Sequence, residues 1–341
     1  MSHEHQGPAT YVGQAGAGRR VIEPVDTAVT ALLGHGRRGP ANQPVFVTSA
    51  ADFDHKYGDA RGSLRRAVRD FFTHGGRRAL TMRVTNPTQA LASLAEHDWQ
   101  LLVVDPSVAI PADAHAVCQE HRAFLVCDAS EDGGLAAGLG TNAAAYFPPF
   151  TGRNGSRPCA PAVAGVYALT DRTRGVWKAP AGGEAKLHRP LSHDLTDSQA
   201  DELAQRHVNA LRTFPGIGAV VWGARTATDD PEWKYVPVRR LFLFLERSIE
   251  RGLQWVALEP NTEPTWSQVR LSVSTFLHNL WRQGALAGRT PDESYFVRCD
   301  QTTMTQNDID SGRLIVYLGV APIKPAEFIT FRIQVLTARD A

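Results

Sequence analysis

The first half of the chain alternates short apolar runs with stretches of helical periodicity. The apolar runs have the length of strands and lie within residues 26–36, 78–84, 98–108 and 121–130. Between the first two runs, residues 63–76 repeat apolar side chains on one helical face and end in two glycines. Short apolar strands that alternate with helices are typical of a buried parallel sheet. We therefore predict an α/β layer over residues 26–155.

The middle of the chain is rich in proline and glycine. Residues 147–187 predict a long irregular segment at the surface, and such a segment in a compact chain is usually functional or part of an interface. Residues 194–214 follow as a predicted helix, in which Thr196 is the N-cap and Gln199 completes a capping box. The Pro-Gly pair directly after residue 214 is expected to end this helix.

The last third of the chain predicts two helices and several strands. The helices lie at residues 236–252 and 265–284, and strands are expected at residues 218–225, 253–261, 295–300, 312–322 and 327–337. The last strand alternates cleanly, because Ile329, Phe331, Ile333 and Val335 all fall on one face. The predicted fold class is therefore α/β, with mixed sheets and flanking helices.

Composition narrows the classes of function. The 341 residues are 43% hydrophobic and 21% charged, as in an ordinary soluble globular protein that is large enough for two lobes. The net charge of +1 gives no basic field for nucleic acid. No apolar run approaches the roughly 20 residues that cross a bilayer, so no membrane insertion is predicted.

The N-terminus carries no recognisable targeting pattern. It lacks a basic region followed by an apolar one, so no signal peptide is predicted. The first 25 residues are glycine-rich and poor in large apolar side chains, and we expect them to be disordered or extended when alone. The four cysteines are scattered without a paired spacing, which favours a reduced chain.

One stretch, FPGIGAVVWGART at residues 214–226, superficially resembles a phosphate-binding loop. A dinucleotide fingerprint needs its glycines after a strand and at the start of a helix. Here the glycines follow a predicted helix and open an apolar run, and no third glycine stands at the required spacing. We interpret them as a helix stop and a tight turn into a buried strand.

A second candidate site is a possible metal-binding face. His115, Cys118 and His121 stand at i, i+3 and i+6 spacing, which could bring three ligands to one side of a helix. No clear fourth ligand accompanies them, and Cys118 also fits a helix that packs on the next strand. We favour a structural cysteine with surface histidines, and we predict neither metal nor cofactor.

No catalytic constellation is apparent in the sequence. G-x-S-x-G, Walker and H-E-x-x-H motifs are missing from it. Ser192, His193 and Asp194 are adjacent and cannot face one another as a triad, and Asp229 and Asp230 lie in a polar turn. We predict no enzyme; an α/β enzyme or small-ligand-binding protein, with its ligand at a strand switch point, is the alternative.

Several long motifs resemble the contractile tail sheath proteins of myophages, R-type pyocins and extracellular contractile injection systems. They follow the family's order at residues 165–182, 214–240, 253–261, 280–288 and 295–333. The N-terminal half agrees more loosely, at residues 36–58 and 64–84. The family's N-terminal opening appears only as GPATYV, and the chain is short enough to resemble the compact principal sheath subunit of extracellular injection systems.

The resemblance implies a tail-sheath fold with two extended arms. It implies an N-terminal arm at residues 1–25, core parts at residues 26–155 and 156–326, and a C-terminal strand or arm at residues 327–341. In the family, arms add strands to sheets of neighbouring subunits, since a sheet edge has unpaired N–H and C=O groups. The expected inter-subunit arm contacts are Tyr11, Val12, Val21, Ile22, Ile329, Phe331, Ile333 and Val335.

The resemblance also implies partners and a mechanism. Family members stack as hexameric rings around an inner tube protein and meet baseplate and terminal cap proteins. Contraction of the metastable sheath drives the tube through a target membrane without nucleotide, using free energy stored at assembly. The chain is thus expected to be assembled in a bacterial cytoplasm and then released in a phage or phage tail-like particle.

The helix at residues 265–284 is the expected contact with the inner tube. Its polar and basic stripe consists of Arg270, Ser274, His278 and Arg282, at successive i+4 positions. Val269, Val273, Phe276 and Leu280 form the opposite, core-facing stripe. In similar sheaths a basic helix touches an acidic tube, and we carry that role over to this stripe.

Overall fold

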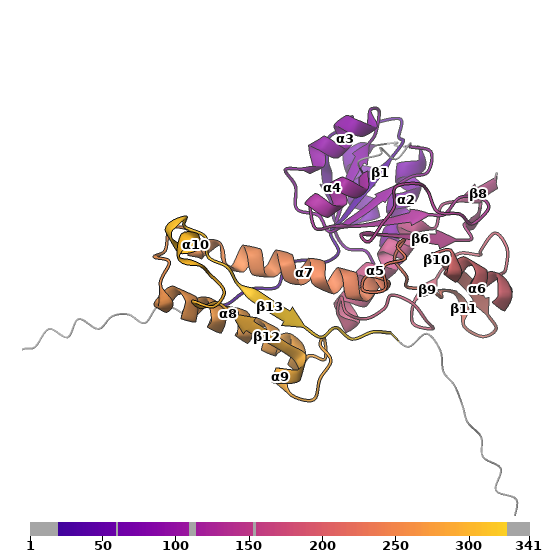
Figure 1. The fold of residues 1–341 in the computed structure, drawn as a ribbon. Coiled ribbons are helices and arrows are strands. Elements are labelled where there is room, and N and C mark those ends of the chain that lie inside the picture. The colour runs from indigo at the N-terminus through magenta and orange to yellow at the C-terminus, as the bar shows by residue number, and fades with distance from the viewer. Residues whose placement is uncertain (1–19, 59–60, 109–113, 153–154, 326–341) are drawn as a thin grey trace, which may run out of the picture. The chain divides into compact units, whose positions relative to one another are not determined.

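A computed structural model describes residues 20–58, 61–108, 114–152 and 155–325 (Figure 1). These residues form two compact units. We call residues 25–247 the sheet unit, and residues 20–24 with 248–321 the hairpin unit. The first 19 residues and the strand predicted at residues 327–337 lie outside the described residues.

The sheet unit is built on a nine-stranded mixed sheet with the order β2-β3-β1-β4-β5-β6-β10-β11-β9. Neighbouring strands from β3 through β1, β4, β5 and β6 to β10 are parallel, and the pairs β2–β3, β10–β11 and β11–β9 are antiparallel. The strands are β1 (Thr30–Gly34), β2 (Val45–Val47), β3 (Ala79–Arg83), β4 (Leu101–Val104), β5 (Phe124–Asp128), β6 (Ala143–Phe147), β9 (Lys186–Leu187), β10 (Val208–Phe214) and β11 (Gly218–Val221). The parallel strands predicted from the apolar runs are confirmed.

Helices cover both faces of this sheet. They are α1 (Ala50–Tyr57), α2 (Ser63–Thr73), α3 (Pro87–Leu94), α4 (Ala114–Glu120), α5 (Ala160–Arg174) and α6 (Asp197–Gln205). Successive residues of a strand point to opposite faces of the sheet, and both faces of this sheet are buried. Leu32 packs in one core with residues of α2 and α5, whereas Leu33 packs in the other core with residues of α3 and α4. Burial on both faces explains why the strands are continuously apolar.

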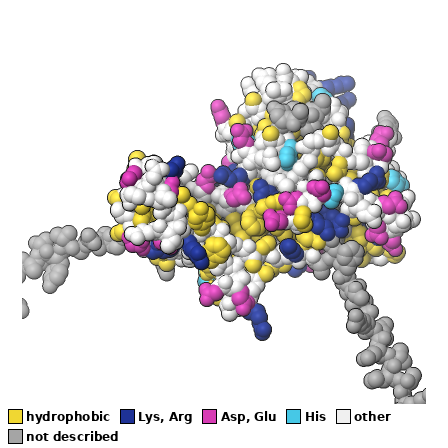
Figure 2. Space-filling model, viewed as in Figure 1, with side chains coloured by type: hydrophobic (Ala, Val, Ile, Leu, Met, Phe, Trp, Pro, Cys, Tyr) yellow, Lys and Arg dark blue, Asp and Glu magenta, His cyan; other side chains and the backbone are white. Residues whose placement is uncertain are grey.

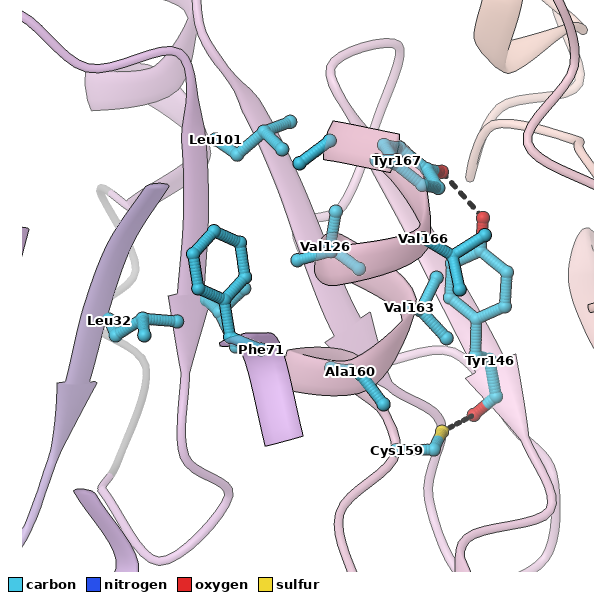
Figure 3. Packing of buried hydrophobic residues seen from close by; sticks show 14 of the residues in the cluster. Leu32, Phe71, Leu101, Val126, Tyr146, Cys159, Ala160, Val163, Val166 and Tyr167 are labelled. Atoms are coloured by element: carbon cyan, nitrogen blue, oxygen red, sulfur yellow. Dashed lines mark hydrogen bonds between the residues drawn. The ribbon is translucent and has the colours of Figure 1, made fainter. Parts of the chain in front are cut away.

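The long irregular segment predicted at residues 147–187 is wrong over α5. This helix has Pro161 in its first turn, where the missing N–H of proline costs nothing. Figure 3 shows Val163 and Tyr167 of α5 beside Leu101 and Val126 of the sheet. A short hairpin of β7 (Phe150–Gly152) and β8 (Gly155–Arg157) precedes α5. The sheet continues through β10, β11 and β9, so the predicted boundary at residue 155 falls inside this unit.

The helix predicted at residues 194–214 is correct only in its first half. The capping box of Thr196 and Gln199 is present. The helix ends at Gln205, and His207 follows in a left-handed conformation with φ of 59°, which helical backbone does not adopt. The remaining residues form β10, which lies parallel to β6 in the sheet.

The Gly-x-Gly motif therefore makes a hairpin turn rather than a helix stop. Phe214 of β10 pairs with Gly218 of β11, and the chain reverses between them. Gly216 and Gly218 have φ of 76° and 91°, the left-handed region that favours glycine. The motif thus shapes a turn between the two strands β10 and β11.

The helix predicted at residues 236–252 is confirmed as α7 (Val236–Gly252). The boundary between the two units falls within this helix. The strand predicted at residues 253–261 is wrong, because these residues form the 3₁₀ helix η1 (Gln254–Val256) and local turns. Leu258 has φ of 73°, which interrupts any extended run.

The hairpin unit is built around the helix α8 (Glu263–Arg282). Its predicted core stripe is confirmed, since Val269, Val273, Phe276 and Leu280 are all buried. Two strands, β12 (Tyr295–Arg298) and β13 (Tyr317–Val320), pair antiparallel and form a two-stranded sheet among the described residues. They confirm the strands expected at residues 295–300 and 312–322 over a shorter length. The short helices α9 (Pro291–Ser294) and α10 (Gln306–Asp310) complete the unit.

Candidate functional site

Of the expected arm contacts, only Val21 and Ile22 belong to the described residues. Tyr11, Val12, Ile329, Phe331, Ile333 and Val335 lie outside the described residues. Val21 is 60% exposed, whereas Ile22 is buried. A Cβ built on Gly252 would stand 2.7 Å from Cγ1 of Ile22, so the glycine at the end of α7 makes room for this side chain. Ile22 therefore fixes the N-terminal segment to its own hairpin unit.

Arg20 holds the same segment to the residues around η1. Its guanidinium lies 3.9 Å from the ring centroid of Trp255 and donates to the carboxylate of Glu259 at 3.1 Å. A cation over an indole face is the most favourable cation–π geometry. Arg20 and Ile22 thus define the place from which the preceding residues leave the unit.

A second anchor holds the chain where it enters the sheet unit. Arg240 of α7 donates to both carboxylate oxygens of Asp171, at 2.9 and 2.6 Å, and to the carbonyl oxygen of Thr27 at 2.9 Å. The hydroxyl of Thr27 donates to the same carboxylate at 2.6 Å. The pair is closed to solvent, so the backbone at Thr27 is fixed by charged groups of α5 and α7.

The two-stranded sheet of the hairpin unit has a half-open surface. Tyr295 and Val297 alternate with the exposed Phe296 and Arg298 along β12, and Tyr317 of β13 is 57% exposed. The ring of Phe296, 52% exposed, lies over Gly319 of the paired strand, where a Cβ would meet it at 2.3 Å. Within the described residues no further strand pairs with β12 or β13. Both outer edges therefore present backbone groups to another strand.

The basic stripe of α8 is divided between internal contacts and solvent. Arg270 donates to the carbonyl oxygen of Cys299 and, at 2.5 Å, to Glu263. His278 contacts the hydroxyl of Tyr295 through Nδ1 at 3.3 Å. Ser274 is half-buried, and Arg282 is exposed. Among the four stripe residues, Arg282 is thus the one most accessible to a partner.

The possible metal face at α4 packs as a structural element. Cys118 is fully buried, and burial raises the pKa of its thiol far above the usual range. The ring of His121 lies 5.2 Å from that of Trp99. Over the described part of the chain, no group of three or more metal-ligating side chains that could hold a metal ion occurs.

The adjacent residues considered as a catalytic triad lie at the surface. The hydroxyl of Ser192 lies 3.1 Å from Nδ1 of its neighbour His193, and both residues are exposed.

Two networks of charged side chains are not predicted by the sequence. One is the Thr27–Asp171–Arg240 anchor. In the other, the buried carboxylate of Asp70 on α2 accepts from Nε of Arg157 and Nε of Arg189, each at 2.7 Å. The hydrogen-bonded partners in these networks are 69 to 213 positions apart, so no local pattern could have paired them. The described helices include none that is long and apolar enough to span a membrane.

Comparison with known proteins identifies the family. The phage tail sheath C-terminal domain family matches residues 228–336. The tail sheath protein of Vibrio phage KVP40 is 31% identical over 199 residues, which cover 57% of this chain but 29% of that protein. The chain thus spans under a third of the phage relative's length.

Solved structures match nearly the whole chain. The sheath of an extracellular contractile injection system, PVC, in its contracted state has a TM-score of 0.84, 31% identity and coverage of 98% of both chains. The contracted helical sheath of the anti-feeding prophage has the same TM-score and identity, and covers 97% of this chain and 99% of its own. These matches carry the tail-sheath fold across both units, and the chain belongs to the contractile tail sheath protein family as a structural sheath subunit.

Proposed function

We propose that this protein polymerises as stacked hexameric rings around an inner tube and that contraction of this sheath drives the tube through a target membrane. The open two-stranded sheet of β12 and β13 carries this proposal. Two strands alone are marginally stable in water, and this pair exposes Phe296 and Tyr317. Strands donated by neighbouring copies would complete the sheet and cover these rings.

The terminal segments are the strands that we assign to this sheet. Residues 8–19 precede the anchor formed by Arg20 and Ile22, and residues 327–337 follow β13 after a short linker. The alternation of Ile329, Phe331, Ile333 and Val335 suits a strand with one buried face. Because Ile22 is held within its own unit, Tyr11, Val12 and Val21 are the N-terminal side chains left for inter-subunit contact.

The partners follow from this assembly. The sheath subunit binds further copies of itself, the inner tube protein, and the baseplate and terminal cap proteins at the two ends of the particle. It assembles in a bacterial cytoplasm and leaves in a phage or phage tail-like particle. Its role is structural, with no catalytic step of its own and no nucleotide.

Electron microscopy tests the proposal. Purified full-length protein should form wide tubes or rings in negative stain, and a variant that lacks residues 1–19 should remain folded but unassembled. Circular dichroism and thermal unfolding establish that the truncated variant is folded. Full-length protein that stays monomeric up to high concentration, or truncated protein that still forms tubes, would contradict the proposal.

The inner-tube contact is tested through Arg282. We propose that this side chain of the α8 stripe meets an acidic tube, with Arg270, Ser274 and His278 shaping the surface around it. Arg282→Glu should weaken co-sedimentation of the sheath with its tube, whereas Arg289→Glu, an exposed arginine after α8, is the matched control. Equal co-sedimentation of the two variants would refute the assignment.

A further inference from the structure

A groove of about 620 Å³ lies on the sheet unit where the chain enters it from the N-terminal segment. One wall is formed by residues 25–28. The opposite walls are the turn between α2 and β3, with Gly75, Arg77 and Arg78, and the end of α5, with Asp171 and Arg172. We call this feature the arginine groove. All its lining residues belong to the sheet unit.

The arginine groove carries an excess of positive charge. Its two carboxylates are already paired, since Asp26 accepts from Arg78 and Asp171 accepts from Arg240. Arg172 donates to the carbonyl oxygen of Gly75 at 3.2 Å, which leaves its charge uncompensated. Arg77 is exposed and makes no ion pair with another described residue. The groove therefore offers two guanidinium groups, whose planar forks suit carboxylates.

The opposite charge is found on α6 of the same unit. Asp194, just before the helix, and Asp197 and Asp201 within it are all exposed. Figure 2 shows acidic side chains over this region of the surface. Asp197 is bound by Arg212 at 2.7 Å, but neither Asp194 nor Asp201 has an ion-pair partner among the described residues. Asp194 and Asp201 thus carry exposed negative charges that no cation of the described residues compensates.

We propose that the arginine groove of one copy receives the acidic face of α6 from a second copy. This inference rests on the proposed function and names a contact for the same assembly. The two surfaces are different patches of one compact unit, so their contact is heterologous and repeats from copy to copy, as rings and helical assemblies require. Residues 25–28, which follow the N-terminal segment anchored by Arg20 and Ile22, also form one wall of this groove.

Charge reversal tests this contact. Arg77→Glu with Arg172→Glu makes the groove acidic, and Asp194→Arg with Asp201→Arg makes the α6 face basic. Each variant alone should raise the concentration needed for tube formation at least tenfold, as measured by sedimentation and negative stain. An equimolar mixture of the two variants should assemble again, because each groove then finds an α6 face of opposite charge.

The matched control is Arg37→Glu with Arg38→Glu, which changes the charge equally at exposed positions away from the groove. It should assemble as the wild type does, and all variants should keep the thermal midpoint of the wild type. If the wild type forms tubes and the reversed variants do so equally well, or if the mixture fails to restore assembly, the inference is wrong while the proposed function stands. A wild type that forms no tubes contradicts both.

Discussion

Arg240 and Asp171 form a two-pronged ion pair that is almost closed to solvent, with 3% and 4% of their side-chain surfaces exposed. The guanidinium also lies 4.8 Å from the ring centroid of Tyr167, which covers its face. Thr27 binds both partners, with its hydroxyl to Asp171 and its carbonyl oxygen to Arg240. The pair therefore fixes the start of the sheet unit to α5 and α7.

Removal of one partner should be costly. Asp171→Asn leaves the Arg240 cation buried without a counter-charge, and loss of one member of a buried pair typically costs about 3–5 kcal/mol. Urea unfolding of the variant should show this loss. The control is Arg174→Gln, which breaks the exposed Arg174–Glu184 pair and should cost about 1 kcal/mol or less. Similar losses for both variants would show that burial does not matter here.

Gly165 allows α2 and α5 to pack closely. A Cβ at this position would stand 2.5 Å from the carbonyl oxygen of Phe71 and 2.9 Å from Cβ of His74. Gly165→Ala gains about 1 kcal/mol of helix propensity, but the separation of two packed backbones costs about 1–3 kcal/mol. We therefore expect a net loss of stability in thermal unfolding. Gly183→Ala, where a Cβ meets nothing within 4 Å, should be close to neutral.

The sequence predicted the first parallel strands of the sheet better than it predicted α5 and β10. Apolar runs such as that of β4 are visible locally, because burial on both faces leaves no polar position. The α5 helix was missed because flanking prolines and glycines resemble a loop, although its small residues are what close packing on α2 requires. β10 was missed because its first residues continue the periodicity of α6, and its state is decided by pairing with the distant strand β6, where Val208 lies opposite Ala145.

The candidate assembly surfaces were predicted unevenly for a related reason. The stripe on α8 follows from helical periodicity, but periodicity does not reveal that Arg270 donates to a carbonyl 29 positions later. Likewise, alternation identifies β12 as a strand without showing that, among the described residues, β13 is the strand that pairs with it. Long-range pairing decides which polar side chains are free to meet another subunit.

The buried ring of His74 should make stability depend on pH. Its Nε2 accepts from the backbone N–H of His188 at 2.9 Å, and its Nδ1 donates to the carbonyl oxygen of Asp70 at 2.7 Å. Burial lowers the pKa of His74, and the nearby His188 and Arg189 also disfavour its cation, while Asp70 favours it. Arg157 also donates to the Asp70 carboxylate, at 2.7 Å.

The sign of this effect follows from proton binding. Below about pH 6.5 the unfolded state binds a proton at this histidine that the folded state excludes. The contribution of His74 is therefore complete above pH 6.5 and is lost as pH falls toward the lowered pKa of the folded state. Between pH 7.5 and pH 5, the free energy of unfolding measured in urea should fall less steeply for His74→Phe than for the wild type. Identical slopes would contradict this assignment.

Phe296 should contribute to assembly far more than to folding. Its ring is half-exposed on β12, so Phe296→Ser removes little from the core. Full burial of a large apolar side chain gains about 1.5–3 kcal/mol. Covering the exposed half of this ring with a donated strand is thus worth about 1 kcal/mol, or roughly a fivefold change in the affinity of each contact.

Phe46→Ser, at a ring that is 45% exposed on the sheet unit, is the matched control. Sedimentation should show impaired tube formation for Phe296→Ser alone, with both thermal midpoints near the wild-type value. Equal assembly of the two variants would exclude the β12 surface as the acceptor of the arms.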